Sequence, residues 1–152
     1  MFDRYLTATY VEGGREWPCV DCWGLVIIAR CELFGLPMLS HFGAVTRHTP
    51  VDMQRAYRAE VDRALAECRP GPGVIAAAMR GLVCIHVGLV VEKEGRLRVL
   101  EINPRSNPSL ALLEDFEARY LRVIYYRDRD ISVETCGRAA GAAPDYPAGD
   151  HP

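Results

Sequence analysis

The sequence lacks the features that mark several large classes of protein. It has no cluster of lysine and arginine interleaved with aromatic residues, and its formal charge is −2, so nucleic acid is not an expected partner. Its apolar runs are far shorter than the roughly 20 residues that span a bilayer, so no membrane insertion is expected. The N-terminus has no long apolar segment followed by a small-residue cleavage site, and we expect cytoplasmic synthesis without a signal peptide.

Signals for metal sites and disulfide frameworks are also sparse. Cys19 and Cys22 form a CxxC pair, but the sequence has no second CxxC or HxxxH motif to complete the roughly four ligands of a structural zinc site. The six cysteines do not form the framework of a small secreted domain, because several lie in apolar runs typical of a core. We therefore expect no metal and no organic cofactor. A redox disulfide between Cys19 and Cys22 stays open as a minor alternative.

Composition indicates one globular domain followed by a tail. The 152 residues are 49% hydrophobic and 25% charged, which suffices for a single core. No internal repeat is present. After residue 135 the chain is rich in Gly, Ala and Pro and has no apolar periodicity. We therefore expect a domain over residues 1–135 and a flexible tail over residues 136–152.

Helix signals gather in the first half of the chain. Residues 21–34 are apolar on nearly every face, with Asp21 as N-cap and Gly35 as stop signal, which predicts a buried central helix. A second helix is predicted to begin at Pro50 and to end near residue 70. Its apolar face consists of Met53, Tyr57, Val61, Ala64, Leu65 and Cys68.

Short apolar runs typical of strands follow the PGPG turn at residues 70–73. The turn between the second and third runs contains Glu94 and Gly95, which suits an antiparallel hairpin. A brief helix is predicted near residues 108–117. Helices followed by strands predict an α+β domain, with N-terminal helices packed on a small antiparallel sheet. The strand-like runs cover residues 74–79, 82–91, 97–102 and 121–126.

One cysteine and one histidine have the sequence context of a nucleophile and its base. Cys22 falls in the first turn of the predicted buried helix, where the helix N-terminus favours the thiolate of a group whose free pKa is about 8.5, and its backbone amide is a candidate oxyanion donor. His86 lies in the HVGLVVE strand, and we expect its ring to face the helix, with Gly88 leaving space on the same face. Glu101 and Asn103 share one face of the next strand. Either can orient the imidazole, and the carboxylate of Glu101 is favoured.

Each of these residues also has a structural interpretation. Cysteine is among the most buried residue types, so Cys22 alone would be read as a packing residue. A single histidine inside a strand is commonly structural. Glu101 could equally form an ion pair with Arg98 or Arg105.

Taken together, these residues resemble a known family. Tyr10, the glycines 13 and 14, the DCWGLV segment over residues 21–26, the PGPG turn and the HVGLVVE strand are similar to the NlpC family of papain-like cysteine peptidases, in the form found in phage tails and gene transfer agents. The resemblance extends over residues 1 to 127. It implies a papain-like core of α+β class. It also implies hydrolysis of peptide bonds in the bacterial cell wall (peptidoglycan), commonly next to D-glutamate.

The resemblance also assigns roles to single residues. It makes Cys22 the nucleophile and His86 the base, while Tyr10 and Asp21 receive a substrate amine and line the oxyanion side. Family members often carry histidine in a Leu-His-Ala string where this chain has Glu101, a departure at the third triad position. The expected partners are the peptidoglycan stem peptide and the hub or tail-tip proteins of a phage-like particle, so the chain would be a virion component. The alternative is a catalytically weak or inactive structural tail-tip subunit with the same fold.

Overall fold

The computed structural model describes residues 1–42 and 48–129. At its centre lies α1 (Cys22–Phe34), whose ends match the sequence signals. The Asp21 side chain accepts a hydrogen bond from the Gly24 N–H at 2.9 Å, and Gly35 ends the helix in the left-handed conformation with φ 63°. The middle of the helix is buried. The predicted buried central helix is therefore confirmed.

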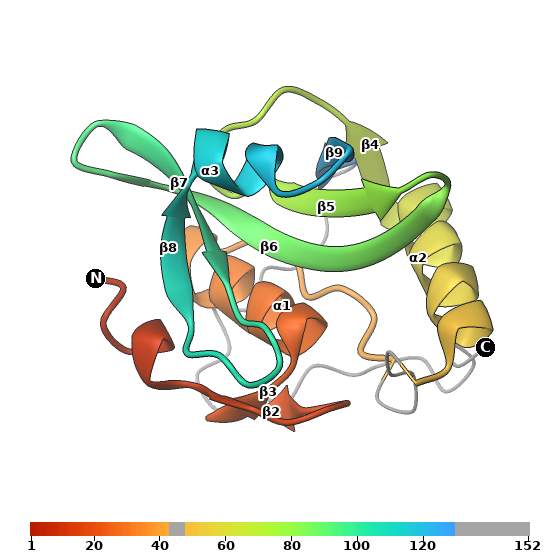
Figure 1. Ribbon diagram of the computed structural model, residues 1–152, viewed down its shortest axis with the longest axis horizontal. Helices are drawn as coiled ribbons and strands as arrows, with labels where there is room; N and C mark the ends of the chain where they lie inside the picture. The colour runs from red at the N-terminus through yellow and green to blue at the C-terminus, as the bar shows by residue number, and fades with distance from the viewer. Residues whose placement is uncertain (43–47, 130–152) are drawn as a thin grey trace.

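A six-stranded antiparallel sheet packs over α1 and fills the upper part of Figure 1. Its strand order is β4-β9-β5-β6-β7-β8. The four predicted strand regions correspond to β5, β6, β7 and β9, and Glu94 and Gly95 have the positive φ values of a tight hairpin turn, 55° and 74°. The strands are β4 (Leu65–Glu67), β5 (Ile75–Arg80), β6 (Val83–Lys93), β7 (Arg96–Glu101), β8 (Ser109–Leu112) and β9 (Arg122–Asp128).

Two predicted helix boundaries are wrong, for the same reason. The second helix, α2 (Pro50–Ala64), ends well before residue 70, because residues 65–67 pair with β9 as strand β4. Leu65 is buried there as it would be on a helix face, so the apolar pattern alone does not reveal the change. Likewise the predicted helix over 108–117 begins late, as α3 (Leu113–Ala118), because residues 109–112 pair with β7.

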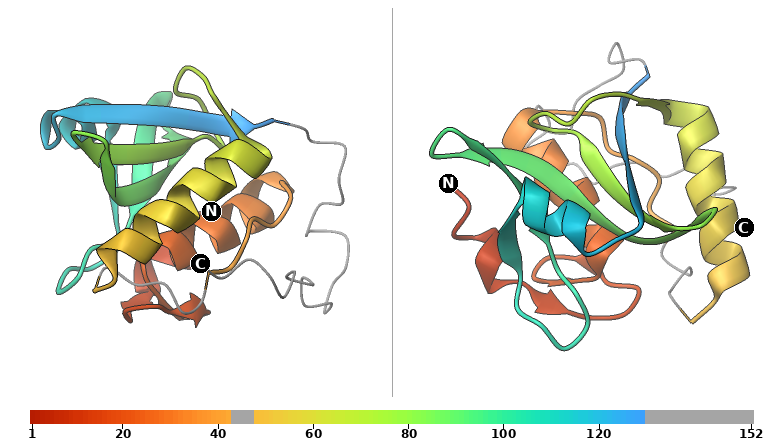
Figure 2. Two further views of the ribbon diagram at one scale, coloured as in Figure 1. Left: turned by 90° about the vertical axis from the view of Figure 1, so that its right-hand side faces the viewer. Right: turned by 45° about the horizontal axis from the view of Figure 1, so that its top comes forward.

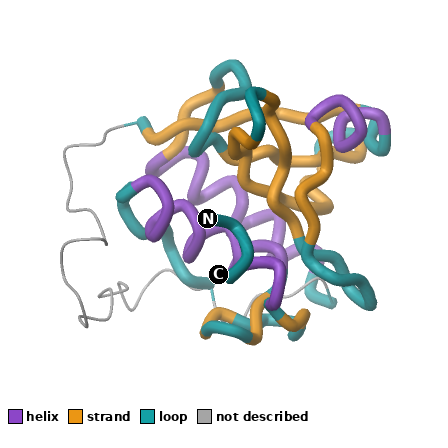
Figure 3. Tube along the Cα trace, turned by 90° about the vertical axis from the view of Figure 1, so that its left-hand side faces the viewer, coloured by secondary structure: helices purple, strands orange, loops and turns teal. Residues whose placement is uncertain are grey.

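A second, smaller sheet lies at the N-terminus of α1, below the main sheet in Figures 1 and 3. It has the order β1-β3-β2, with β1 parallel to β3, and a short 3₁₀ helix precedes it at Tyr5–Thr7. The sequence signals described above do not predict this sheet. Its strands are β1 (Thr9–Tyr10), β2 (Arg15–Glu16) and β3 (Cys19–Val20).

The elements form layers around the main sheet. Helices α1 and α2 lie on one side of it and α3 on the other, as the views in Figures 1 and 2 show. Apolar side chains of α1, β5 and β6 form the larger core, and Phe116 of α3 anchors a second core on the opposite face. The α+β class is thus confirmed. Within the described ranges, every helix falls short of the length and apolarity needed to cross a membrane.

A buried ion pair ties the central helix to the sheet. Arg30 of α1 is 1% exposed; one of its guanidinium nitrogens contacts the Asp128 carboxylate of β9, and the other donates to the Pro37 carbonyl at 2.8 Å. Burial lowers the pKa of Arg30 and raises the pKa of Asp128, in each case against the attraction of the partner. Desolvation therefore outweighs the attraction within this pair.

Candidate active site

A β-bulge in β6 sets the direction of His86. Two consecutive residues of β5 pair with Cys84 and His86, so Ile85 is an extra residue in β6. Cys84 packs into the core on the α1 side, whereas the His86 ring centroid lies 6.0 Å from that of Phe116 and 6.2 Å from that of Tyr120. A regular strand would place Cys84 and His86 on one face. The bulge instead places their side chains on opposite faces of the sheet.

Gln54 of α2 holds the backbone next to this bulge. Strand β7 pairs with β6 from Leu89 onward, so the backbone of Cys84 has no β7 partner. Instead, the Gln54 side-chain amide donates to the Cys84 carbonyl at 2.8 Å and accepts from the Cys84 N–H at 2.8 Å. Both backbone groups are satisfied. The first part of β6, and His86 with it, is therefore anchored to α2.

Three groups meet at the carboxylate of Glu101. His86 Nε2 lies 2.9 Å from Oε1, Asn103 Nδ2 donates to the same oxygen at 3.1 Å, and the Arg119 guanidinium contacts Oε2. Glu101 and His86 are 2% and 4% exposed. Of the two residues predicted as third triad member, Glu101 therefore contacts the imidazole, and Asn103 contacts Glu101.

Cys22 and His86 both line one cavity, so the predicted meeting of the two residues is found. The expectation that the imidazole faces the α1 side of the sheet is not met, because the bulge places its ring beside Phe116 and Tyr120. Burial opposes protonation of the imidazole, but hydrogen bonding and charge interactions with Cys22 and Glu101 outweigh it and raise the pKa of His86 to about 9. Because His86 Nε2 is hydrogen-bonded to Glu101 Oε1, the ring nitrogen available to Cys22 is Nδ1. The arrangement therefore favours a protonated imidazole beside the Glu101 carboxylate at neutral pH.

The pKa of Glu101 is also shifted in the direction that favours its charged form. Burial alone would raise the pKa of Glu101, but the hydrogen bond and charge of His86, together with Arg119, hold that pKa below its usual value. Arg119 also lies over the rings of Phe116 and Tyr120, with its central carbon 5.1 Å and 5.4 Å from their centroids. The contact of Arg119 with Glu101 cannot be predicted from the sequence, because α3 sets the position of Arg119 and no local spacing relates it to Glu101.

Gly88 has a different role from the predicted one. A Cβ on this residue would overlap Cγ1 of Val99 and come within 3.5 Å of the Glu101 Cβ. The missing side chain lets β7 approach β6 closely. Gly88 thus makes room for the strand that carries Glu101, and the expectation that it leaves space beside the imidazole is corrected.

Asp21 is held inside the fold next to Cys22, the predicted nucleophile. Its Oδ1 accepts from the Gly24 N–H and from Arg15 Nη1 at 2.6 Å, and its Oδ2 accepts from the Gly13 N–H at 3.1 Å. These contacts fix the small sheet to the first turn of α1 and leave the N–H groups of Cys22 and Trp23 without an intrahelical partner. The implied role of Asp21 toward a substrate amine stays a prediction.

Tyr10 and Asp21 both line the same cavity as Cys22 and His86. The Tyr10 hydroxyl donates to Glu12 Oε2 at 2.6 Å. The cavity has a volume of about 100 Å³ and is bounded by α1, α2, the small sheet and the near face of the main sheet. Tyr10 is therefore placed where a substrate could meet it.

The other described cysteines differ from Cys22. Cys19 is exposed on β3, and both Cys19 and Cys22 are free thiols in this structure. Cys84 lines the cavity, but burial and the nearby charge of Cys22 raise the pKa of Cys84 to about 12, so it stays protonated. Cys22 is thus the thiol with a base beside it.

The arrangement supplies what acyl transfer by a thiol requires: a nucleophile at a helix N-terminus, a protonated base beside it, a carboxylate that orients the base, and free amide donors.

Among residues 1–42 and 48–129, no three histidine, cysteine or acidic side chains are grouped to hold a metal ion. The predicted tail over residues 136–152 lies outside the described residues. No family model, no curated protein and no solved structure matches this chain.

Proposed function

We propose that this chain is a cysteine peptidase that cleaves peptide bonds of peptidoglycan, with Cys22, His86 and Glu101 as its catalytic triad. The observation that carries the proposal is the buried array in which His86 contacts Glu101 at 2.9 Å and has its pKa raised to about 9 by Cys22 and Glu101. A histidine with only a structural role has no need of a thiol on one ring nitrogen and a carboxylate on the other.

The reaction follows from the positions of these groups. The Cys22 thiolate attacks the scissile carbonyl carbon, and the N–H groups of Cys22 and Trp23 stabilise the oxyanion. His86 gives its proton to the leaving amine, so the C–N bond breaks and a thioester remains on Cys22. His86 then takes a proton from water, which attacks the thioester and releases the acid. Glu101 stabilises the imidazolium throughout, and Asn103 and Arg119 position Glu101.

The peptidoglycan substrate and a place in a phage-like tail or gene transfer agent follow from the NlpC-type resemblance of residues 1–127, supported by the triad geometry. In such a particle, hub or tail-tip proteins would bring the enzyme to the wall. The test is the release of stem-peptide fragments from purified muropeptides by the purified chain, with Cys22→Ala as reference. Equal product from both proteins would reject the proposal.

A second candidate is a structural tail-tip subunit with little or no turnover. Leu82 and Leu121 are 84% and 90% exposed, and both lie at the end of the sheet where the β5–β6 turn meets the start of β9. Exposed leucines at one end of a sheet favour contact with another protein. This surface supports assembly with or without catalysis.

The reactivity of Cys22 distinguishes these two candidates. If His86 activates Cys22, a His86→Ala variant should alkylate at Cys22 with iodoacetamide at least about tenfold more slowly than the parent chain at neutral pH. Mass spectrometry of the labelled peptides measures the rate at each cysteine. Cys19 serves as the internal control, because it is exposed and is not among the residues that line the cavity with His86. Unchanged labelling of Cys22 would favour the inactive subunit.

The pH dependence of hydrolysis follows from the raised pKa of His86. Since the imidazolium must protonate the leaving amine, kcat/KM should fall as pH rises through about 9. The same shift affects folding: the stabilisation by protonated His86 is complete below its ordinary value of 6.5 and is lost as pH rises through about 9. A pH–rate profile with parallel measurement of folding separates the two effects. An alkaline limb near 6.5 would contradict the assignment.

Arg119 should influence the alkaline limb of the pH–rate profile, although it does not contact the substrate. In Arg119→Gln, the Glu101 carboxylate loses the group that holds its Oε2 in place, and a positive charge near the His86 imidazolium is removed, so the limb should move to higher pH. We expect kcat/KM to fall roughly tenfold, the size of one charge-assisted hydrogen bond partly open to water. Arg96→Gln, which removes an exposed ion pair with Glu114, is the matched control. Equal pH profiles for the two variants would exclude the positioning role.

A further inference from the structure

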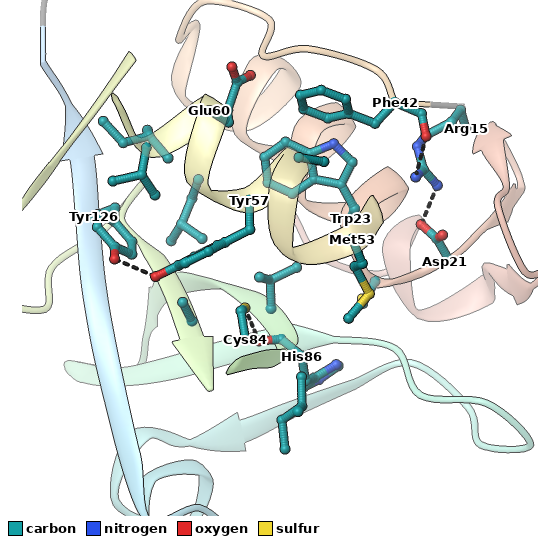
Figure 4. Close-up of a pocket in the computed structure, with 18 of the residues that line it drawn as sticks. Arg15, Asp21, Trp23, Phe42, Met53, Tyr57, Glu60, Cys84, His86 and Tyr126 are labelled. Carbon is teal, nitrogen blue, oxygen red and sulfur yellow. Dashed lines mark hydrogen bonds and ion pairs between the residues drawn. The ribbon is translucent and has the colours of Figure 1, made fainter. Parts of the chain in front are cut away.

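The cavity beside Cys22 is mostly apolar. It is lined by aliphatic and aromatic side chains of α1, α2 and the main sheet, and Cys22 and His86 lie on its wall. Figure 4 shows the Arg15–Asp21 pair at one end and Tyr57 with Tyr126 at the other. The apolar wall between these ends includes Trp23, Met53, Ala56, Val61, Ile75 and Ala77.

The charged groups of the wall are already paired within the protein. Arg15 bonds to Asp21 and to the carbonyl oxygens of His41 and Phe42 at 2.6 Å and 3.2 Å. The buried Glu60 carboxylate accepts from the Ser40 backbone and hydroxyl groups and from Arg63 Nε at 2.7 Å.

The hydroxyl groups at the two ends are paired as well. Tyr57 and Tyr126 bond to each other, and Tyr10 donates to Glu12. A substrate carboxylate entering this space would lose its hydration and meet the side-chain oxygens of Glu60 and Asp21, which are already engaged within the protein.

We propose that this cavity receives a small, uncharged aliphatic group on the acyl side of the bond that Cys22 attacks. The acyl group stays bonded to Cys22 after the amine leaves, so its side chain is the part of the substrate that an enclosed wall can hold through both steps. A volume of about 100 Å³ is smaller than the roughly 150 Å³ that accepts benzene, so it suits a side chain of alanine to valine size. The inference rests on the proposed function in its choice of Cys22 as nucleophile. It favours an alanyl over a glutamyl acyl group.

Acylation of Cys22 by activated esters tests this preference without requiring peptide turnover. In each reaction the Cys22 sulfur forms a bond to the carbonyl carbon, the C–O bond breaks, and p-nitrophenolate leaves with the electron pair. The probes are p-nitrophenyl isobutyrate and p-nitrophenyl hemisuccinate, each rate being divided by the rate with free cysteine. Cys22→Ala supplies the background. We expect the isobutyrate to react at least about tenfold faster after this normalisation.

Two variants and one control locate the preference in the cavity. Ala56→Leu fills the space and should remove most of the isobutyrate advantage, whereas Ala59→Leu, an exposed position on the same helix, should keep it. Val61→Ala enlarges the cavity and should speed acylation by p-nitrophenyl hexanoate relative to isobutyrate, which keeps the test valid if Ala56→Leu does not fold.

The outcomes separate this inference from the proposed function. Acylation of Cys22 with no preference, or with preference for the hemisuccinate, would overturn the inference and leave the peptidase proposal intact. A clear isobutyrate preference without any muropeptide cleavage would support the inference and count against the wall substrate. Absence of Cys22-dependent acylation would overturn both.

Discussion

Replacing Cys22 by alanine is expected to lower the rate of muropeptide cleavage by at least about 10⁴-fold, to the level of the uncatalysed reaction or close to it. Alanine has no atom that can form the thioester, and Cys84, which lines the same cavity, has its pKa raised to about 12 and cannot replace the thiolate. Chromatography of the released stem peptides with mass detection measures the loss. Folding of the variant should be preserved, because Cys22 is only partly buried at the helix end.

Cys19→Ala is the matched control for this loss. Cys19 lies on β3, three positions before the nucleophile, is exposed, and is also a free thiol. Its replacement should leave cleavage within about twofold of the parent rate, since surface substitutions away from special features have small effects. A large loss in Cys19→Ala together with full activity in Cys22→Ala would reverse the assignment of the nucleophile.

The largest expected effect on stability comes from Asp128→Ala. This change leaves the Arg30 guanidinium buried without its carboxylate, and breaking a buried ion pair by removing one partner costs about 3–5 kcal/mol. Since small domains are stable by only about 5–15 kcal/mol, the variant should unfold at a much lower urea concentration. Chemical denaturation followed by circular dichroism gives the difference in free energy of unfolding.

Two further variants test the physical reason for this prediction. Asp52→Ala removes the exposed ion pair with Arg55, whose atoms lie 3.6 Å apart, and should cost no more than about 1 kcal/mol. The double variant Arg30→Met with Asp128→Leu should recover most of the loss, because desolvation opposes the charged form of both partners in the native fold. A double variant as unstable as Asp128→Ala would show that the Arg30 contact with Pro37 is the important one.

The sequence predicted elements whose signals are local. Asp21 and Gly35 define the ends of α1 because capping and the left-handed conformation depend on single residues. Glu94 and Gly95 likewise mark the β6–β7 turn, whose register places Leu89 opposite Leu100. This register places Glu101, the last residue of β7, near His86, which explains why a carboxylate on the next strand could be expected there.

Features set by distant contacts were not predictable. The β4 strand forms because β9 offers an open edge to Leu65, and the bulge at Ile85 depends on pairing with β5. The choice between Glu101 and Asn103 needed the actual direction of the His86 ring, which the bulge determines. Arg119 reaches Glu101 only through the placement of α3. Sequence alone therefore placed the proposed triad on its helix and strands but did not reveal the groups that orient it.

The two hydrogen bonds between the Gln54 side chain and the Cys84 backbone make the Cys84 amide a reporter of whether α2 is packed on the sheet. The Cys84 amide proton is protected from solvent exchange by a side chain of α2 and not by a neighbouring strand. Deuterium uptake at that single amide therefore follows the detachment of α2, while the rest of the sheet remains protected. Detachment of α2 would also release the bulge beside the imidazole, so the same signal would report when His86, the proposed base, is no longer held in place.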